Sequence, residues 1–227
     1  MRGSGTLAVD FHGGIIPLKG RARPVLRIVV LAAGLSTRLG SPKALVRIYG
    51  VPLLRRTLGV LRPFAAAQDI IVVVPPGASR YRIAAAGIPA AFVPNPGRAS
   101  GLSSSVLAGL RRARYSAGVL VLPVDLAGLT ARDIARLIRR WRSARRKVVA
   151  RDMGGPGSPL VLPHWLYRRA EGLTGDRGLR DLVRRLPGAA VCLVAMPSAV
   201  RDVDTPADLE RARRRVRPAA ASPNSPE

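Results

Sequence analysis

The segment "IVVLAAGLSTRLGSPKAL", residues 28–45, joins an apolar run to a loop whose residue types suit a polyphosphate. Small residues let backbone N–H groups approach an anion, and the hydroxyls of Ser36 and Thr37 can donate to it. Arg38 offers a planar fork to phosphate oxygens, whereas Lys43 offers a compact charge that fits between two phosphates. The residue types leave a second interpretation open, a strand-to-helix turn with solvated basic residues. The spacing matches neither G-x-G-x-x-G nor a Walker A loop.

Lysine is scarce in this chain, which makes Lys43 stand out. The sequence has 38 Lys and Arg residues, of which only Lys19, Lys43 and Lys147 are lysine. The formal net charge is +25, which would suit a nucleic-acid surface, an enzyme for polyanionic substrates such as nucleotides, or a bias that places arginine on solvated faces. The arginines are spread along several expected helices and aromatic residues make up only 4% of the chain, so we expect the bias and regard nucleic acid as an unlikely partner.

A basic, non-catalytic α/β module that binds RNA remains the alternative from another functional class. Its RNA binding would depend on salt concentration, and it would survive the substitutions Asp125→Ala and Lys43→Ala. The single cysteine, Cys192, excludes an internal disulfide framework and lies in an apolar run, so we expect it in the core. We find no apolar run of about 18 residues and no clear secretory leader, and we therefore expect a cytoplasmic protein without a membrane span.

Hydrophobic patterning predicts strands that alternate with helices. We expect strands at 25–32, 69–75, 90–94, 118–123, 146–150 and 190–195, and helices at 52–62, 79–87, 103–113, 130–143, 164–173, 176–186 and 205–216. This alternation predicts an α/β fold, a three-layer α/β/α sandwich around a Rossmann-like, mostly parallel sheet. We expect residues 1–24 to be a poorly ordered N-terminal extension, 25–217 to form one domain, and 218–227 to be a disordered tail.

Ligands of such sheets bind outside the carboxyl ends of the strands, which directs attention to the loops 32–43, 94–105 and 123–129. Asp125 follows the fourth strand, where a carboxylate can hold Mg²⁺ together with substrate phosphates, or can bond to backbone N–H groups of its own turn. Asp204 has the same two possibilities, because it stands just before a helix start at Thr205 and Pro206. Serines at 103–105 read either as helix caps or as ligand contacts.

Four segments together carry a family resemblance that spans most of residues 28–212. "LAAGLSTRLGSPKAL" resembles the signature L-A-[AG]-G-x-S-x-R-x-G-x-x-K-x-L of the MobA-like nucleotidyltransferases, which include the molybdenum-cofactor cytidylyl- and guanylyltransferases. "NPGRASGLSSSVLAGL", "GSPLVLPHWLYRRAEGLTGDRGLRDLV" and "DVDTPADL" are similar to three later segments of that family.

The resemblance implies a nucleotidyltransferase fold and a Mg²⁺-dependent transfer of a nucleoside monophosphate from a nucleoside triphosphate to a phosphorylated acceptor, with release of pyrophosphate. It implies catalytic roles for Arg38, Lys43 and Asp125, and Mg²⁺ on Asp125 and, as a second ligand, Asp204. The nucleotide-binding residues that it implies are Leu31, Ala32, Ala33, Gly34, Ser36, Arg38, Lys43, Asn95, Gly101 and Ser105. A molybdopterin-type acceptor and molybdoenzyme-maturation partners follow from the same resemblance.

Some positions bear on the substrates. Ala33 gives "LAAG", which looks more like the cytidylyl type than the guanylyl "LAGG", so we expect CTP, with GTP or another phosphorylated acceptor as alternatives. Ala127 replaces a proline of the family pattern, and Ser158 replaces a histidine, which affects any base or acceptor contact made there. "GDRG", residues 175–178, is expected to shape the acceptor side, with a helix cap as the other interpretation of Asp176.

Overall fold

A computed structural model describes residues 7–9, 15–17, 26–144, 147–197 and 202–215. Its strands are β1 Leu7–Val9, β2 Ile15–Pro17, β3 Leu26–Leu31, β4 Arg47–Ile48, β5 Val51–Pro52, β6 Ile70–Val74, β7 Ala91–Pro94, β8 Gly118–Pro123, β9 Val148–Asp152, β10 Pro156–Pro163 and β11 Val191–Val194. Its α-helices are α1 Leu53–Leu61, α2 Ser79–Ala84, α3 Leu102–Ala113, α4 Ala131–Ser143, α5 Tyr167–Ala170, α6 Leu179–Arg184 and α7 Pro206–Arg215. Most of the expected N-terminal extension and the whole expected tail lie outside the described residues; within the extension, β1 pairs with β2.

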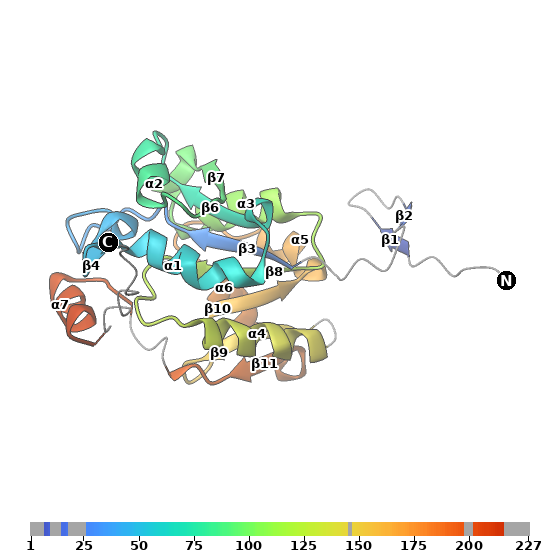
Figure 1. Ribbon diagram of the computed structural model, residues 1–227. Helices are drawn as coiled ribbons and strands as arrows, with labels where there is room; N and C mark the ends of the chain where they lie inside the picture. Colours follow the sequence, from blue (N-terminus) through green and yellow to red (C-terminus); the bar gives the residue numbers. More distant parts are fainter. Residues whose placement is uncertain (1–6, 10–14, 18–25, 145–146, 198–201, 216–227) are drawn as a thin grey trace, which may run out of the picture.

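The main sheet has seven strands in the order β11-β9-β10-β8-β3-β6-β7. β3 runs parallel to both β6 and β8, with Leu31 opposite Val73 on one side and Pro123 on the other. The predicted three-layer α/β/α sandwich with a mostly parallel sheet is therefore confirmed. Because β3, β6, β7, β8 and β9 share one direction, the loops that follow them meet at one edge of the sheet (Figure 1).

β10 is the strand that the sequence did not reveal. It runs antiparallel to both β8 and β9 and lies between them. Prolines are normally evidence against a central strand because they cannot donate a ladder hydrogen bond. Here Pro156 and Pro163 stand at the two ends of β10, and Pro159 falls where the pairing with β9 shifts between Gly157 and Leu160. The short β4–β5 hairpin after Lys43 was also not expected.

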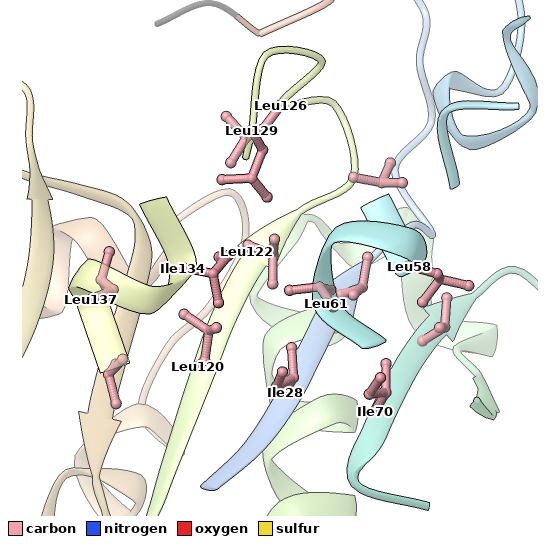
Figure 2. Packing of buried hydrophobic residues seen from close by; sticks show 14 of the residues in the cluster. Ile28, Leu58, Leu61, Ile70, Leu120, Leu122, Leu126, Leu129, Ile134 and Leu137 are labelled. Atoms are coloured by element: carbon pink, nitrogen blue, oxygen red, sulfur yellow. The ribbon is translucent and has the colours of Figure 1, made fainter. Parts of the chain in front are cut away.

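Two apolar cores fill the space between the sheet and its helices. One core joins the sheet to α1, α2 and α4, and the other joins it to α3, α5 and α6. Figure 2 shows part of the first, where side chains of β3 and β8 (Ile28, Leu120, Leu122) face those of α1 and α4 (Leu58, Leu61, Ile134, Leu137). Leu126 and Leu129 extend this core into the loop after β8, so that loop is anchored to the sandwich. Cys192 is buried in the same core, as expected.

Helix starts differ from the expectations in instructive ways. The predicted cap of α4 is confirmed, since Thr130 accepts from Asp133 N and Asp133 accepts from Thr130 N. The predicted serine cap of α3 is wrong: the residue before that helix is Gly101, and no side chain caps it. The hydroxyls of Ser104 and Ser105 instead accept from Asn95 Nδ2. Asp181, rather than Asp176, makes the hydrogen bond at the start of α6: its carboxylate accepts from Gly178 N.

The arginines lie on solvent-exposed sides of several helices. Arg111 and Arg112 are exposed on α3, Arg139 and Arg140 on α4, and Arg184 on α6. Since α3 and α4 cover opposite faces of the sheet (Figure 1), these charges do not gather on one surface. None of the described helices is long and apolar enough to cross a bilayer.

Close packing of α3 on the sheet requires Gly109. A Cβ at this position would lie 2.4 Å from Val29 Cγ1 and 3.3 Å from Val73 Cγ2. Gly109→Ala should therefore destabilise the fold by about 1–3 kcal/mol through overpacking, measured by urea unfolding. Gly59→Ala in α1 is the matched control, because its Cβ would meet only Ile88 Cδ1 at 3.8 Å. The control should be neutral or stabilising, and equal effects of the two substitutions would contradict the packing argument.

Candidate active site

The first loop of the site leaves the sheet from the end of β3. Ala32 and Ala33 are buried, and Ala32 N donates to Val73 O of β6 at 2.8 Å. The chain then turns at Ser36, whose φ is 55° and whose carbonyl accepts from Leu39 N and Gly40 N, both at 3.2 Å. The turn exposes Gly34 and the residues around it at the carboxyl edge of the sheet. The loop therefore has a buried root and an exposed, backbone-rich tip.

Lys43 is the residue that links this loop to the others. Its backbone N–H donates to Ser36 Oγ at 3.1 Å, so the turn and the lysine form one unit. Its Nζ donates to Asp125 Oδ2 at 2.6 Å and to Asp204 Oδ1. Burial by itself would lower the pKa of Lys43, but the charges and hydrogen bonds of Asp125 and Asp204 outweigh it and raise the pKa. The ammonium is thus held as a cation between two carboxylates, which lie 82 and 161 residues away in sequence.

Three segments of the chain form hydrogen bonds with the main chain at Asp125 and Val124. Just before it, Val124 N donates to Leu31 O at 3.1 Å, which ties the loop to β3. Thr57 of α1 is buried and donates to Val124 O at 3.3 Å. The Asp125 carbonyl accepts from Val203 N at 3.1 Å, and Leu126 pairs with Asp202 as an isolated β-bridge. These contacts bring the segment that carries Asp204 against the loop that carries Asp125.

Asp204 does not bond to the N–H groups of the helix that follows it, so the helix-capping interpretation of this residue is wrong. Thr205 and Asp208 make that contact: Asp208 Oδ2 accepts from Thr205 N at 2.9 Å, and Thr205 Oγ1 accepts from Asp208 N at 3.2 Å. Hydrogen bonds from Thr205 and Arg211 lower the pKa of Asp208 to about 2, which keeps it ionised for this role. The carboxylate of Asp204 remains directed at Lys43.

The oxygen atoms of Asp125 and Asp204 fit a divalent cation. Asp125 Oδ1 is buried and has no hydrogen-bond partner in the described structure, and a buried carboxylate oxygen without a partner is rare unless an ion or water completes it. No group of three or more His, Cys, Asp or Glu residues among the described ranges could hold a metal ion. Two carboxylates nevertheless suit Mg²⁺, which binds through one or two carboxylates, substrate phosphates and water.

Two further charged residues lie at this edge, and the sequence interpretation did not assign them a role. Partial burial raises the pKa of Asp202 to about 6, and repulsion from Asp125 and Asp204 adds to this effect. Arg151, near the end of β9, is only 5% exposed; burial lowers its pKa, and the charges of Asp202 and Asp133 oppose that effect. Arg151 Nη1 donates to Ser158 O at 3.4 Å, which places the serine that replaces the family histidine beside this cation. The position of Arg151 at the end of a strand, and that of Asp202 two residues before Asp204, were the signals that could have identified them.

The loop after β7 builds the other side of the site. Asn95 is 4% exposed, and its Nδ2 donates to Ser104 Oγ at 2.9 Å and to Ser105 Oγ at 3.0 Å. Gly101 has φ 96° and lies directly against the "GDRG" segment, since a Cβ there would be 2.4 Å from Gly175 C and O. Ser103 N donates to Gly175 O at 3.0 Å. Three of the expected residues (Asn95, Gly101, Ser105) thus form one packed unit with the expected acceptor-side segment.

The contacts of Arg38 and Arg98, the arginines of these two loops, differ from those that the sequence indicated. Arg38 is exposed on the turn and makes no hydrogen bond or ion pair with the described part of the chain, so the structure does not join it to Lys43 and Asp125. Arg98, which the sequence interpretation passed over, donates from Nη2 to Gly34 O at 3.2 Å. Its place in a loop that follows a strand was again the available signal.

The fold and the site define an α/β protein with a basic, backbone-rich loop beside paired carboxylates at the carboxyl edge of a parallel sheet. Residues 28–191 match the family described as "MobA-like NTP transferase domain". The chain belongs to this family, as the resemblance indicated, and is a nucleotidyltransferase of the MobA-like type.

Two curated relatives cover most of the chain. A "Probable molybdenum cofactor guanylyltransferase" of Rhodopirellula baltica is 32% identical over 195 residues, 83% of this chain and 92% of that protein. The "Nicotine blue oxidoreductase" of Paenarthrobacter nicotinovorans is 30% identical over 191 residues, 80% of this chain and 93% of that protein. The names differ in reaction, so the family is shared while the acceptor and the nucleotide are not fixed by it.

A solved relative confirms the architecture. Rv0371c from Mycobacterium tuberculosis aligns with a TM-score of 0.71 at 27% identity, over 85% of this chain and 100% of that one. A second structure of that protein, in complex with manganese, aligns with a TM-score of 0.66 at 27% identity, over 84% of this chain and 99% of that one. That relative therefore binds a divalent cation, manganese.

The contact between Gly101 and Gly175 gives a testable prediction. Gly101→Ala puts a Cβ into backbone atoms of Gly175 at 2.4 Å, at a φ that favours glycine, so the two loops must separate. We expect a lower melting temperature and weaker nucleotide binding, measured by thermal unfolding with and without nucleotide. Gly188→Ala is the control, because nothing lies within 4 Å of its Cβ position. A variant that keeps the wild-type melting temperature and binding would contradict the close contact.

Proposed function

We propose that this protein transfers a nucleoside monophosphate from a nucleoside triphosphate, CTP in the first place, to a phosphorylated acceptor of the molybdopterin type, and releases pyrophosphate. The observation that carries the proposal is the cation of Lys43 held between Asp125 and Asp204, directly after the loop that bears the family signature. Family membership supports nucleotidyl transfer, while the nucleotide, the acceptor and the residue roles are our proposals.

The acceptor phosphate oxygen attacks the α-phosphorus of the triphosphate, and the bond to the pyrophosphate oxygen breaks. A phosphate nucleophile is already anionic near neutral pH, so the reaction needs no dedicated general base. The task left to the protein is to position the reactants and to neutralise charge. Lys43 serves this task as a compact cation, and the exposed backbone at Gly34 and Leu35 offers N–H groups to the phosphates. Arg38 is exposed on the same turn, and in this proposal it would meet the triphosphate from the solvent side.

Asp125 and Asp204 would hold the divalent cation, which we propose to be Mg²⁺. When bound, such a cation stabilises the negative charge that develops on the phosphate oxygens. The unpartnered Asp125 Oδ1 and the half-exposed Asp204 carboxylate would supply its protein ligands. Both carboxylates also hold Lys43, so the same two side chains would position the lysine and the metal relative to each other.

The choice of CTP rests on Ala33, a single residue, and GTP is the alternative that the guanylyltransferase relative favours. Another phosphorylated acceptor is the second alternative, because relatives of similar identity carry names of different reactions. We further propose that the protein acts in the cytoplasm and meets molybdoenzyme-maturation partners there, as expected for an enzyme that completes a cofactor. These points follow from the proposed reaction.

The decisive experiment is a nucleotide panel. The protein is incubated with each nucleoside triphosphate, Mg²⁺ and molybdopterin, and pyrophosphate is measured; CTP should give the highest rate. Asp125→Asn should lower the rate by on the order of 10² to 10³, because it removes charge while keeping shape. Asp69→Asn is the matched control, since Asp69 pairs with Arg27 far from this site. Absence of pyrophosphate with every nucleotide, across a set of phosphorylated acceptors, would refute the proposal.

The identity of the cation at position 43 can be tested directly. Lys43→Arg should lower kcat by on the order of 10², although arginine replaces lysine almost everywhere else in this chain, because a planar guanidinium is too broad for a place between two anions. The control is Lys147→Arg, at an exposed position. Steady-state pyrophosphate release measures both variants. Intact turnover in Lys43→Arg would show that Lys43 is not a phosphate clamp.

A further inference from the structure

Arg98 connects two loops that leave the sheet from different strands. It lies in the short 3-10 helix Pro96–Ser100 after β7, and its Nη2 donates to the carbonyl of Gly34 after β3 at 3.2 Å. β6 stands between β3 and β7 in the sheet, so this contact spans the carboxyl end of β6. It joins the loop with the family signature to the loop that contains Asn95 and Gly101.

The contact fixes the direction of a peptide group. In a trans peptide the C=O and the following N–H point in opposite directions, so a carbonyl of Gly34 held by Arg98 sends the N–H of Leu35 away from Arg98. No heavy atom lies within 4 Å of a Cβ built on Gly34, so no packing on this side restrains the peptide. Within the described part of the chain, Leu35 N–H donates to no acceptor. That N–H is therefore oriented and still available.

Both the backbone and the guanidinium of Arg98 make hydrogen bonds. Its carbonyl accepts from Gly101 N at 3.4 Å, and the loop around it is fixed by Asn95, which is buried and bonded to two serines. At the other end, Arg98 Nε is buried without a hydrogen-bond partner among the described residues. Buried donors without partners are uncommon in native structures. The hydrogen bond that the guanidinium makes within the described part of the chain is the one to Gly34 O.

We propose that Arg98 is a positioning residue for nucleotide binding: by holding the carbonyl of Gly34, it keeps the N–H of Leu35 directed outward, where an anionic oxygen of the nucleotide accepts from it. The proposal rests on the proposed function in that the 31–43 loop binds a nucleoside triphosphate. Arg98 acts through the backbone, so its loss should weaken nucleotide binding and leave the chemical step unchanged.

The test compares Arg98→Ala with Arg80→Ala. Arg80 is exposed on α2, so both variants lose one positive charge, and only Arg98→Ala loses the contact with Gly34. Nucleotide Kd is measured by calorimetry with each variant, Mg²⁺ and the triphosphate that the wild type binds most tightly. We expect Arg98→Ala to raise Kd and KM by on the order of tenfold with unchanged kcat and melting temperature, and Arg98→Lys to recover part of the affinity.

A second measurement reports on the peptide itself. In ¹⁵N–¹H spectra recorded without nucleotide, the Leu35 amide resonance should shift in Arg98→Ala and stay in place in Arg80→Ala. Equal Kd values for Arg98→Ala and Arg80→Ala would overturn the proposal. A weaker affinity of Arg98→Ala that is accompanied by a lower melting temperature, with no shift of the Leu35 amide resonance, would also overturn it. A wild-type protein that binds no triphosphate would instead refute the proposed function, and the inference with it.

Discussion

The ammonium group of Lys43 between Asp125 and Asp204 is the interaction on which the site depends. It joins the loops after β3 and β8 to the segment before α7, which are distant in sequence. Two carboxylates that share a site repel each other, and a cation between them removes that repulsion. The raised pKa of Lys43, despite its burial, records how strongly the two anions favour the charged amine. In the proposed reaction, the same arrangement would place a compact positive charge and a pair of carboxylate oxygens beside the phosphates of the nucleotide.

The scaffold fixes the main chain of each functional loop, so the side chains of the site are not needed to hold the loops in place. Ala32 N bonds to β6, Val124 N bonds to β3, and Val203 N bonds to the Asp125 carbonyl, so each functional loop is attached to its neighbour through the main chain. The helix start at α7 follows the same logic. Because Thr205 and Asp208 satisfy its N–H groups, Asp204 does not have to. A carboxylate next to a helix start is thereby kept for the site.

The sequence sufficed for the layers, the parallel strands and the edge at which the site lies, because each of these follows from hydrophobic period and strand direction. It did not suffice for β10, which lies inside the sheet. This strand has prolines at its ends and at its irregular pairing with β9, and prolines are normally evidence against a central strand. Nor did it suffice for contacts between loops. Asp204 could equally have capped its helix, and only the capping pair Thr205–Asp208 decides the matter.

The high net charge explains why the sequence did not identify two arginines of the candidate site. In a chain with a net charge of +25, a basic residue carries little information by its type, so only their positions at or after strand ends distinguish Arg98 and Arg151 from arginines on solvated helix faces. Burial separates them: Arg151 is 5% exposed, and Arg98 has a buried donor nitrogen, whereas Arg111 and Arg112 are exposed. A cation is held in a protein interior only where carboxylates or carbonyls surround it. The contacts of these two arginines follow this rule, since Arg98 donates to Gly34 O and Arg151 donates to Ser158 O and lies near the charge of Asp202.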